Sequence, residues 1–170
     1  MIENYICQIN KHKSFEIKLQ EGVFRPTGTS DEIIKAVSEN ITLPGKILDL
    51  GCGSGVVGFA LHILGKSKGK LYASDLSAEA VMLIKENANN LSIPIDSRQG
   101  SIFEPWENKS FDFIVDDISG IAEQVAEISP WFSETSCSSG KDGTNLVIQA
   151  ITSSPEHLNK DGKFFFPVLS

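Results

Sequence analysis

Short apolar runs alternate with segments of helical periodicity along most of this chain of 170 residues. Runs with the length of a strand lie at about residues 46–50, 71–75, 93–98, 111–115 and 163–168. Apolar stripes at helical spacing lie between them, at about residues 56–64, 77–91 and 144–153. Because parallel strands joined by helices need right-handed crossovers, this order predicts a doubly wound, Rossmann-like α/β fold with a mostly parallel sheet and helices on both faces.

The segment before the first of these strands is organised differently. Residues 5–24 alternate in part between apolar and polar side chains, which predicts an opening pair of strands. A capping box is expected from Thr29 and Glu32, and it opens the next helix. We therefore divide the chain into an N-terminal strand pair with a lead-in segment, residues 1–28, and a larger domain, residues 29–170.

Composition excludes several classes of function. The formal net charge of −7 opposes sequence-independent binding to a phosphate backbone, unless a local basic face reverses that balance, and the basic segment 66–70 reads as a solvated turn. Three cysteines without CxxC spacing, Cys7, Cys52 and Cys137, argue against a disulfide framework and against a metal site. Since the chain shows neither a signal peptide nor an apolar run of about 18 residues, we expect a cytoplasmic protein with no membrane partner.

Polar residues follow the predicted strands at the points where they end. Asp49 and Asp75 close the first two strands of the larger domain, Ser101 follows the third, and Asp116 and Asp117 follow the fourth. Doubly wound folds bind ligands beyond the carboxyl ends of their strands. Four strand ends therefore indicate a single pocket.

A glycine-rich turn at residues 49–55 (DLGCGSG) indicates the ligand. Such glycines let a ligand approach the backbone, and Asp75, twenty residues after the last of them, is placed to accept ribose hydroxyls. The segment 53–58 also satisfies the dinucleotide pattern GxGxxG. Asp49 discriminates between the two, because a carboxylate there repels a pyrophosphate but suits a ligand with ammonium and sulfonium centres. S-adenosylmethionine carries both.

Residues 49–55 with Asp75 and Leu76 resemble the nucleotide turn of class I S-adenosylmethionine-dependent methyltransferases. Within that superfamily the chain is most similar to the small methyltransferase group, which includes release-factor glutamine and ribosomal-RNA guanine N2-methyltransferases. Segments 22–29, 100–103 and 139–143 extend the resemblance. By this resemblance the glycines line the methionine moiety, Leu76 and Ile102 enclose the adenine, and Ser101, where the group usually has Asp, bonds its amino group. The cofactor-binding residues expected are Asp49, Gly51, Cys52, Gly53, Gly55, Asp75, Leu76, Ser101, Ile102 and Thr27.

The fourth strand departs from the pattern of that group. Its members end this strand in Asn or Asp, two prolines and an aromatic ring, whose acceptors and ring position the target nitrogen. Here the acid is followed by Ile118, Ser119 and Gly120. We expect Asp117 or Asp116 to act as the acceptor or general base in methyl transfer to a nitrogen or oxygen nucleophile of a protein, small molecule or RNA, with the acidic charge favouring the first two. The alternatives are a cofactor-binding partner subunit or sensor without transferase activity, and an NAD(P)-dependent reductase.

The last strand leaves an edge to explain. The superfamily usually adds a helix and two strands after it, but this sequence stops at residue 170. The apolar run 163–168 predicts burial on both faces, and the helix before it is expected to bury Val147, Ala150 and Ile151. We expect a truncated or shortened domain that self-associates through the edge strand, or else residues 5–24 folding over that edge.

Overall fold

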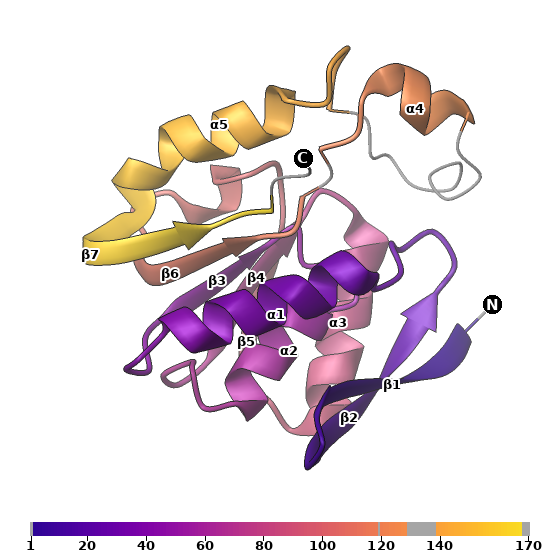
Figure 1. Cartoon of the computed structure of the whole chain (residues 1–170), viewed down its shortest axis with the longest axis vertical. Coiled ribbons are helices and arrows are strands. Elements are labelled where there is room, and N and C mark those ends of the chain that lie inside the picture. Colours follow the sequence, from indigo (N-terminus) through magenta and orange to yellow (C-terminus); the bar gives the residue numbers. More distant parts are fainter. Residues whose placement is uncertain (1, 119, 129–138, 168–170) are drawn as a thin grey trace.

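The computed structural model describes residues 2–118, 120–128 and 139–167, and their strands form two sheets (Figure 1). The smaller sheet is an antiparallel hairpin of β1 (Ile2–Asn10) and β2 (Lys13–Gln20). The larger sheet has five parallel strands in the order β5-β4-β3-β6-β7. They are β3 (Ile47–Leu50), β4 (Leu71–Asp75), β5 (Ile95–Gln99), β6 (Phe111–Asp116) and β7 (Leu158–Phe165). The doubly wound α/β fold is confirmed.

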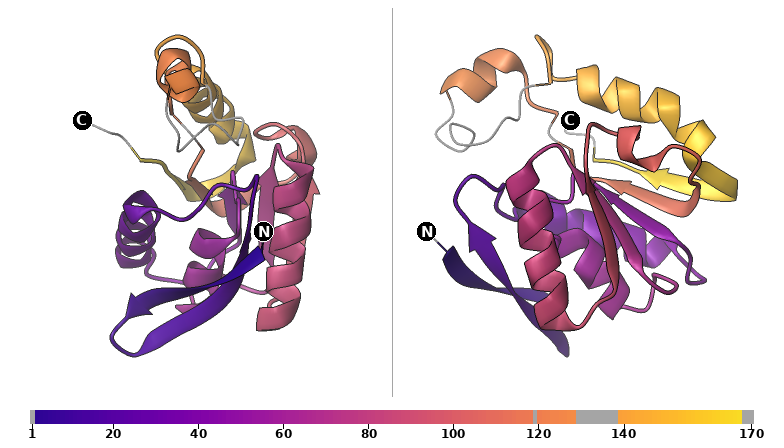
Figure 2. Two further views of the ribbon diagram at one scale, coloured as in Figure 1. Left: turned by 90° about the vertical axis from the view of Figure 1, so that its right-hand side faces the viewer. Right: turned by 180° about the vertical axis from the view of Figure 1, so that it is seen from behind.

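Helices cover both faces of the larger sheet (Figures 1 and 2). One face packs against α1 (Gly28–Asn40), α2 (Val56–Ile63) and α3 (Ala78–Leu91), and the other against α5 (Asn145–Ser153) and the short turns η1 (Glu104–Trp106) and η2 (Ser154–His157). A short helix, α4 (Glu123–Ile128), follows β6. Alternation along β3 explains the two cores, because Ile47 joins the first cluster while Leu48 and Leu50 join the second. Among the described residues, no helix combines the length and apolarity needed to cross a membrane.

The hairpin is fixed to α3 through a buried amide. Asn87 accepts a hydrogen bond from the Lys18 N–H at 2.8 Å and donates to the carbonyl oxygens of Lys18 and Ser54, both at 3.0 Å. Because α3 also packs on β5, at the other end of the sheet from β7, the expectation that residues 5–24 cover the β7 edge is wrong. The division of the chain at residue 28 stays a prediction.

The first long helix begins two residues earlier than expected. Its N-cap is Thr27, whose extended backbone precedes the helix, and not Thr29. The Thr27 carbonyl accepts from the Ser30 N–H at 3.0 Å, and the Ser30 hydroxyl accepts from the Thr27 N–H at 3.4 Å. Ser30 therefore holds the place that the sequence assigned to Glu32.

The last two elements are less buried than expected. On α5 only Ala150 is buried, whereas Val147 is half-buried and Ile151 is 39% exposed. The strand β7 begins five residues before the predicted start and pairs with β6 through an irregular register, so that its polar first half still belongs to the sheet. Phe164 and Phe165 are only half-buried, because β7 is the end strand and α5 meets the sheet through a small side chain.

Candidate functional site

The carboxyl edge of the larger sheet brings the predicted strand ends together. Leu50 of β3 pairs with Ser74 of β4 and with Asp116 of β6, so the three strands end at the same level. The N–H groups of Gly51 and Cys52 both donate to the Ser74 carbonyl, at 2.9 and 3.0 Å. These bonds tie the glycine turn to the end of the neighbouring strand.

The glycine turn has positive φ angles and is tightly packed against its neighbours. Gly51, Gly53 and Gly55 have φ values of 72°, 49° and 87°. A Cβ on Gly51 would come within 2.7 Å of the Ile118 Cγ1, so glycine is required there by both conformation and space. Cys52 is buried in the same turn, and burial beside Asp49 raises the pKa of its thiol well above the ordinary value. Cys52 is therefore a packing residue rather than a nucleophile.

Asp75 is held in a fixed orientation by the backbone around it. Its Oδ2 accepts from the Gly53 N–H and its Oδ1 from the Ser77 N–H, both at 2.9 Å. Each oxygen keeps a further lone pair, so the carboxylate can still accept hydroxyl groups from a ligand. Leu76 follows at the strand end with 61% of its surface exposed, and its carbonyl accepts from the Gln99 Nε2 at 3.2 Å.

Asp49 is buried beneath the first turn of α2. Its Oδ2 accepts from the Gly58 N–H at 2.9 Å, while its Oδ1 has no hydrogen-bond partner. Burial is the main cause that raises the pKa of Asp49 to about 8, and the nearby carboxylates Asp117, Asp75 and Asp116 add to it. The side chain is only 1% exposed, so its free oxygen can be satisfied only by a group that enters the turn.

Asp116 and Asp117 form the acidic end of β6. Asp116 is 1% exposed, accepts from the Ile118 N–H at 2.7 Å through Oδ1, and has no partner for Oδ2. Asp117 is half-buried and accepts from the Ser30 hydroxyl at 3.0 Å. Burial raises the pKa of Asp116 to about 7 and that of Asp117 to about 6. These values are suited to proton transfer near neutral pH.

The remaining predicted residues lie around this edge. Thr27 caps α1, the helix that carries Ser30, and a Cβ on Gly53 would lie 3.7 Å from the Phe24 carbonyl oxygen, so the lead-in segment runs over the turn. Ser101 follows β5 and donates its N–H to the Glu104 carboxylate at 3.0 Å. Ile102 has a φ of 48°, which is strained for a β-branched residue and is common where a loop shapes a site.

Two residues of the site, Ser30 and Ser74, could not be assigned to it from the sequence, because their partners lie far along the chain. Gly58 entered only as the last glycine of the GxGxxG match, and its bond to Asp49 was not predicted. Trp106 is fully buried and donates its indole N–H to the Ser74 hydroxyl at 2.9 Å. In the described part of the chain, no group of three or more His, Cys, Asp or Glu side chains is arranged to hold a metal ion.

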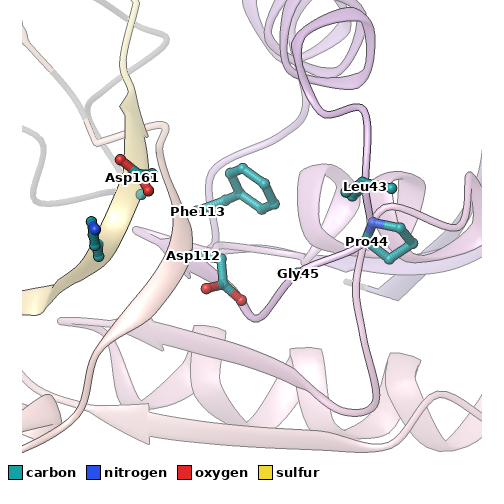
Figure 3. A pocket seen from close by; sticks show the side chains of 8 residues that line it. Leu43, Pro44, Gly45, Asp112, Phe113 and Asp161 are labelled. Atoms are coloured by element: carbon teal, nitrogen blue, oxygen red, sulfur yellow. The ribbon is translucent and has the colours of Figure 1, made fainter.

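A shallow cavity of about 280 Å³ opens at the opposite edge of the sheet (Figure 3). It lies between Leu43 and the starts of β6 and β7, and Asp112 and Asp161 contribute carboxylates to its wall. Both oxygens of Asp112 are already used, by the Lys46 N–H and the Asn159 amide at 2.7 Å each. This cavity is therefore a structural feature of the amino ends of the strands and not the pocket predicted from the strand ends.

Comparison with known proteins identifies the family. Residues 14–117 match the family model of the methyltransferase small domain. The chain belongs to this family. A release factor glutamine methyltransferase of Enterococcus faecalis is 26% identical over 156 residues, and the match covers 88% of this chain and 56% of that relative. A ribosomal protein L11 methyltransferase of Lactobacillus johnsonii is 28% identical over 155 residues, covering 88% of this chain and 40% of the relative. This methyltransferase small domain thus spans little more than half the length of the first relative and less than half that of the second.

Solved structures share the fold. A ribosomal protein L11 methylase from Lactobacillus delbrueckii superimposes with a TM-score of 0.64 at 20% identity and covers 94% of this chain and 78% of that one. A 16S rRNA N2 methyltransferase of T. thermophilus, solved with AdoMet and guanosine, gives 0.68 at 15% identity and covers 96% of this chain and 41% of that one. At these identities the likeness shows the architecture of the domain.

The raised pKa values predict how stability depends on pH. A carboxyl group titrates near 4 in an unfolded chain, whereas Asp49, Asp116 and Asp117 titrate at about 8, 7 and 6 in the fold. The folded state therefore holds more protons across this window, and the free energy of unfolding of the ligand-free protein falls as the pH rises through it. We expect the free energy of unfolding, measured by urea denaturation, to decrease by several kcal/mol between roughly pH 5 and pH 8, since each unit of pKa shift corresponds to about 1.4 kcal/mol.

Two variants separate the buried acids from the general charge of the protein. Asp49→Asn has no proton to lose at this site, so its stability should depend less on pH. Asp161→Asn makes the same substitution at an exposed position of β7, where the φ of 64° suits asparagine, and it should keep the wild-type slope. A free energy of unfolding that increases with pH over this range would contradict the assignment.

Proposed function

We propose that this chain binds S-adenosylmethionine at the carboxyl edge of its larger sheet and transfers the methyl group to a nitrogen or oxygen nucleophile. The observation that carries the proposal is the Asp49 carboxylate, which is buried, bonded to the Gly58 N–H through one oxygen and without a partner for the other. A buried acceptor with a free oxygen calls for a donor, and an ammonium group supplies one with complementary charge.

The same contact weighs against a dinucleotide in this turn. Gly58 is the third glycine of the GxGxxG match, and its N–H is bonded to Asp49 at 2.9 Å. A diphosphate would raise the pKa of this buried acid further, whereas an ammonium group favours its ionised form, and Asp117 adds negative charge at the same edge. The arrangement gives the NAD(P)-dependent reductase no support.

The other site residues fit S-adenosylmethionine in this proposal. Asp75 accepts the ribose hydroxyls with the lone pairs that its two backbone bonds leave free. Leu76 and Ile102 lie against the adenine, and Ser101 meets its amino group. The methionine moiety lies in the glycine turn, against Gly51, Cys52, Gly53 and Gly55. Thr27, at the end of the lead-in segment, contacts it from above. When bound, the cofactor supplies an electrophilic methyl group on a sulfonium centre.

Asp117 is the residue we assign to the proton of the methyl acceptor. It is the more accessible of the two acids at the end of β6, and with a pKa of about 6 it is mostly ionised at neutral pH. The Ser30 hydroxyl donates to its Oδ2 at 3.0 Å and leaves the other oxygen for the acceptor. Asp116, more deeply buried, supports it with a second acceptor oxygen.

The acceptor that we propose is a nitrogen or oxygen group of a protein. Relatives along most of this chain are named as methyltransferases of a release factor and of a ribosomal protein. The absence of prolines and an aromatic ring after Asp117 removes the flat surface on which a free base would stack. A protein side chain reaches the edge from outside and needs acceptor oxygens more than a stacking surface.

Cofactor binding is tested by titration calorimetry with S-adenosylmethionine and with NADH. We expect the protein to bind only S-adenosylmethionine and Asp49→Asn to bind it at least about tenfold more weakly, because the variant keeps an acceptor for Gly58 but lacks the charge that faces the ammonium. Asp161→Asn, which changes the net charge equally, should bind as the wild type does. Binding of NADH alone, or equal affinity in Asp49→Asn, would reject the proposal.

Catalysis is tested once an acceptor is known. Comparison of methylated species by mass spectrometry, in cells with and without the protein, identifies it. Asp117→Asn should then lower kcat by about 10²- to 10⁴-fold with little change in cofactor affinity, because only the proton acceptor is removed. Ser30→Ala should lower kcat less, and Ser30→Thr should restore it. If extracts yield no S-adenosylhomocysteine above the uncatalysed background, the domain binds its cofactor without transferring the methyl group.

We also propose that a second copy of the chain pairs with the outer edge of β7. Among the described residues no strand lies beyond β7. The exposed apolar side chains nearby are Ile148 and Ile151 on α5 and Phe166, the residue after β7. An uncovered edge beside apolar surface favours pairing between chains.

Light scattering over a wide concentration range measures this association. We expect a mass above that of the monomer, and we expect Phe166→Glu to return the protein to the monomer because it places a charge at the end of the edge strand. Met82→Glu, at a more exposed apolar position on α3, serves as the control and should associate as before. A wild-type protein that stays monomeric at all concentrations would overturn the proposal.

A further inference from the structure

A cluster of cations lies on the face of the sheet that carries α5, over β4 and β5. Tyr72 and Ser74 of β4 stand opposite Asp96 and Arg98 of β5, so these four side chains share one face. The link between β5 and β6 contains only the short turn η1, so no long helix from this link covers the sheet here. Its aromatic rings are covered instead by the side chains of Lys46, Lys70, Arg98 and Lys109.

The ammonium groups converge on one ring. The Nζ atoms of Lys46 and Lys109 lie 5.0 Å from the centroid of the Tyr72 ring, and that of Lys70 lies 5.3 Å from it. Any two of these nitrogens are therefore within about 10 Å of each other, which is the screening length of about 0.1 M salt, so the charges repel one another at lower salt. The Arg98 guanidinium lies 4.6 Å from the centroid of the Trp106 ring. Cation–π attraction accounts for where the cations lie but not for their number.

The carboxylates in this cluster do not balance its cations. Asp96 pairs with Arg98 at 2.9 Å, with Lys109 at 3.2 Å and with Lys70 at 3.7 Å, and Arg98 and Lys109 hold its pKa down at about 2. Lys46 donates instead to the Ser110 carbonyl at 2.7 Å. Desolvation and repulsion from Lys109 and Lys70 lower its pKa, despite the opposing pull of Asp112. The carboxylates that interact with these four cations are Asp96 and Asp112, in a chain whose net charge is −7.

We infer that this cluster of Lys46, Lys70, Arg98 and Lys109 is a binding surface for the phosphate backbone of a nucleic acid. The side chains of Lys70 and Lys109 are 46% and 29% exposed, so their ammonium groups can reach a ligand without rearrangement of the sheet. A phosphate backbone offers closely spaced anions along a strand and binds by releasing its counterions, which a compact group of cations drives. This local basic face offsets the opposition that net charge alone would present.

The chemistry of the cluster favours phosphate over an acidic protein. The planar fork of Arg98 is already bonded to Asp96 through two nitrogens, so the groups left are ammonium point charges, which suit phosphate. Interfaces between proteins are poor in lysine and rich in apolar and aromatic surface. None of the large exposed apolar side chains of the described residues belongs to β4, β5 or the link from β5 to β6.

Fluorescence anisotropy with a labelled RNA strand tests the inference. We expect binding that weakens with salt, and we expect Lys70→Gln/Lys109→Gln to weaken it at least about tenfold and to reduce the slope of log K against log salt by about 2, one for each lost phosphate contact. Glutamine keeps much of the stem that covers the rings. The matched control, Lys35→Gln/Lys85→Gln, removes two exposed lysines from α1 and α3 and should bind RNA as the wild type does.

Three results would overturn the inference. They are no RNA binding at low salt, an equal loss in the control variant, or equal or tighter binding of polyglutamate, which would indicate a protein partner. A parallel titration with single-stranded DNA identifies which nucleic acid is preferred. Lys70→Gln alone, at the most exposed position, guards against loss of folding in the double variant. Because S-adenosylmethionine titrates independently of this surface, failure here leaves the proposed activity standing, and failure of that activity leaves RNA binding intact.

Discussion

The hydrogen bond from the Gly58 N–H to the Asp49 carboxylate sets how closely α2 approaches the sheet. The positions of the other groups at the carboxyl edge depend on this distance. A Cβ at residue 58 would lie 2.7 Å from the Asp49 Oδ2 and 2.8 Å from Leu71, so only glycine admits the contact. The first turn of a helix is where backbone amides best accommodate an anion. A short α2 seated on a buried acid therefore leaves the glycine turn directly above it, tied to β4 by the Ser74 carbonyl.

Local spacing revealed the acids of this edge, whereas long-range packing determined what surrounds them. Asp49, Asp75 and Asp117 could be placed together because parallel strands end at one side of a sheet. Ser30 could not, since 87 residues separate it from Asp117 and only folding brings them to 3.0 Å. The roles given to the adenine contacts, Leu76 among them, remain predictions because they concern a ligand and not the chain.

The elements that departed from expectation did so for reasons outside their own sequence. Thr27 and Thr29 are both followed, three residues on, by a side chain able to complete a capping box. In the structure Thr27 is the N-cap, and its partner Ser30 also donates a hydrogen bond to Asp117. The apolar stripe of α5 predicted burial for Ile151, but a stripe shows only which face is apolar. Whether that face is covered depends on what packs beside the end strand.

The residue after Asp117 shows what replaces the family's proline. The Ile118 N–H donates to the Asp116 carboxylate at 2.7 Å, a bond that proline cannot make. The Ile118 side chain also packs against the α-carbon side of Gly51, where a Cβ would clash. The isoleucine thus gives a buried acid its donor and closes the floor of the turn, so its presence is compatible with an intact acidic edge.

The short link between β5 and β6 has a consequence for the underside of the sheet. Helices cover other parts of this sheet. Here the ammonium groups of Lys70 and Lys109 lie over the Tyr72 and Trp106 rings, and the methylene stems of such side chains can shield apolar surface from water. The same lysine side chains thus cover the aromatic rings and hold positive charge at the surface. Substitution of these lysines by alanine would remove both the cover over the rings and the positive charge. It would leave an exposed apolar surface where the native protein has a charged and well-hydrated one.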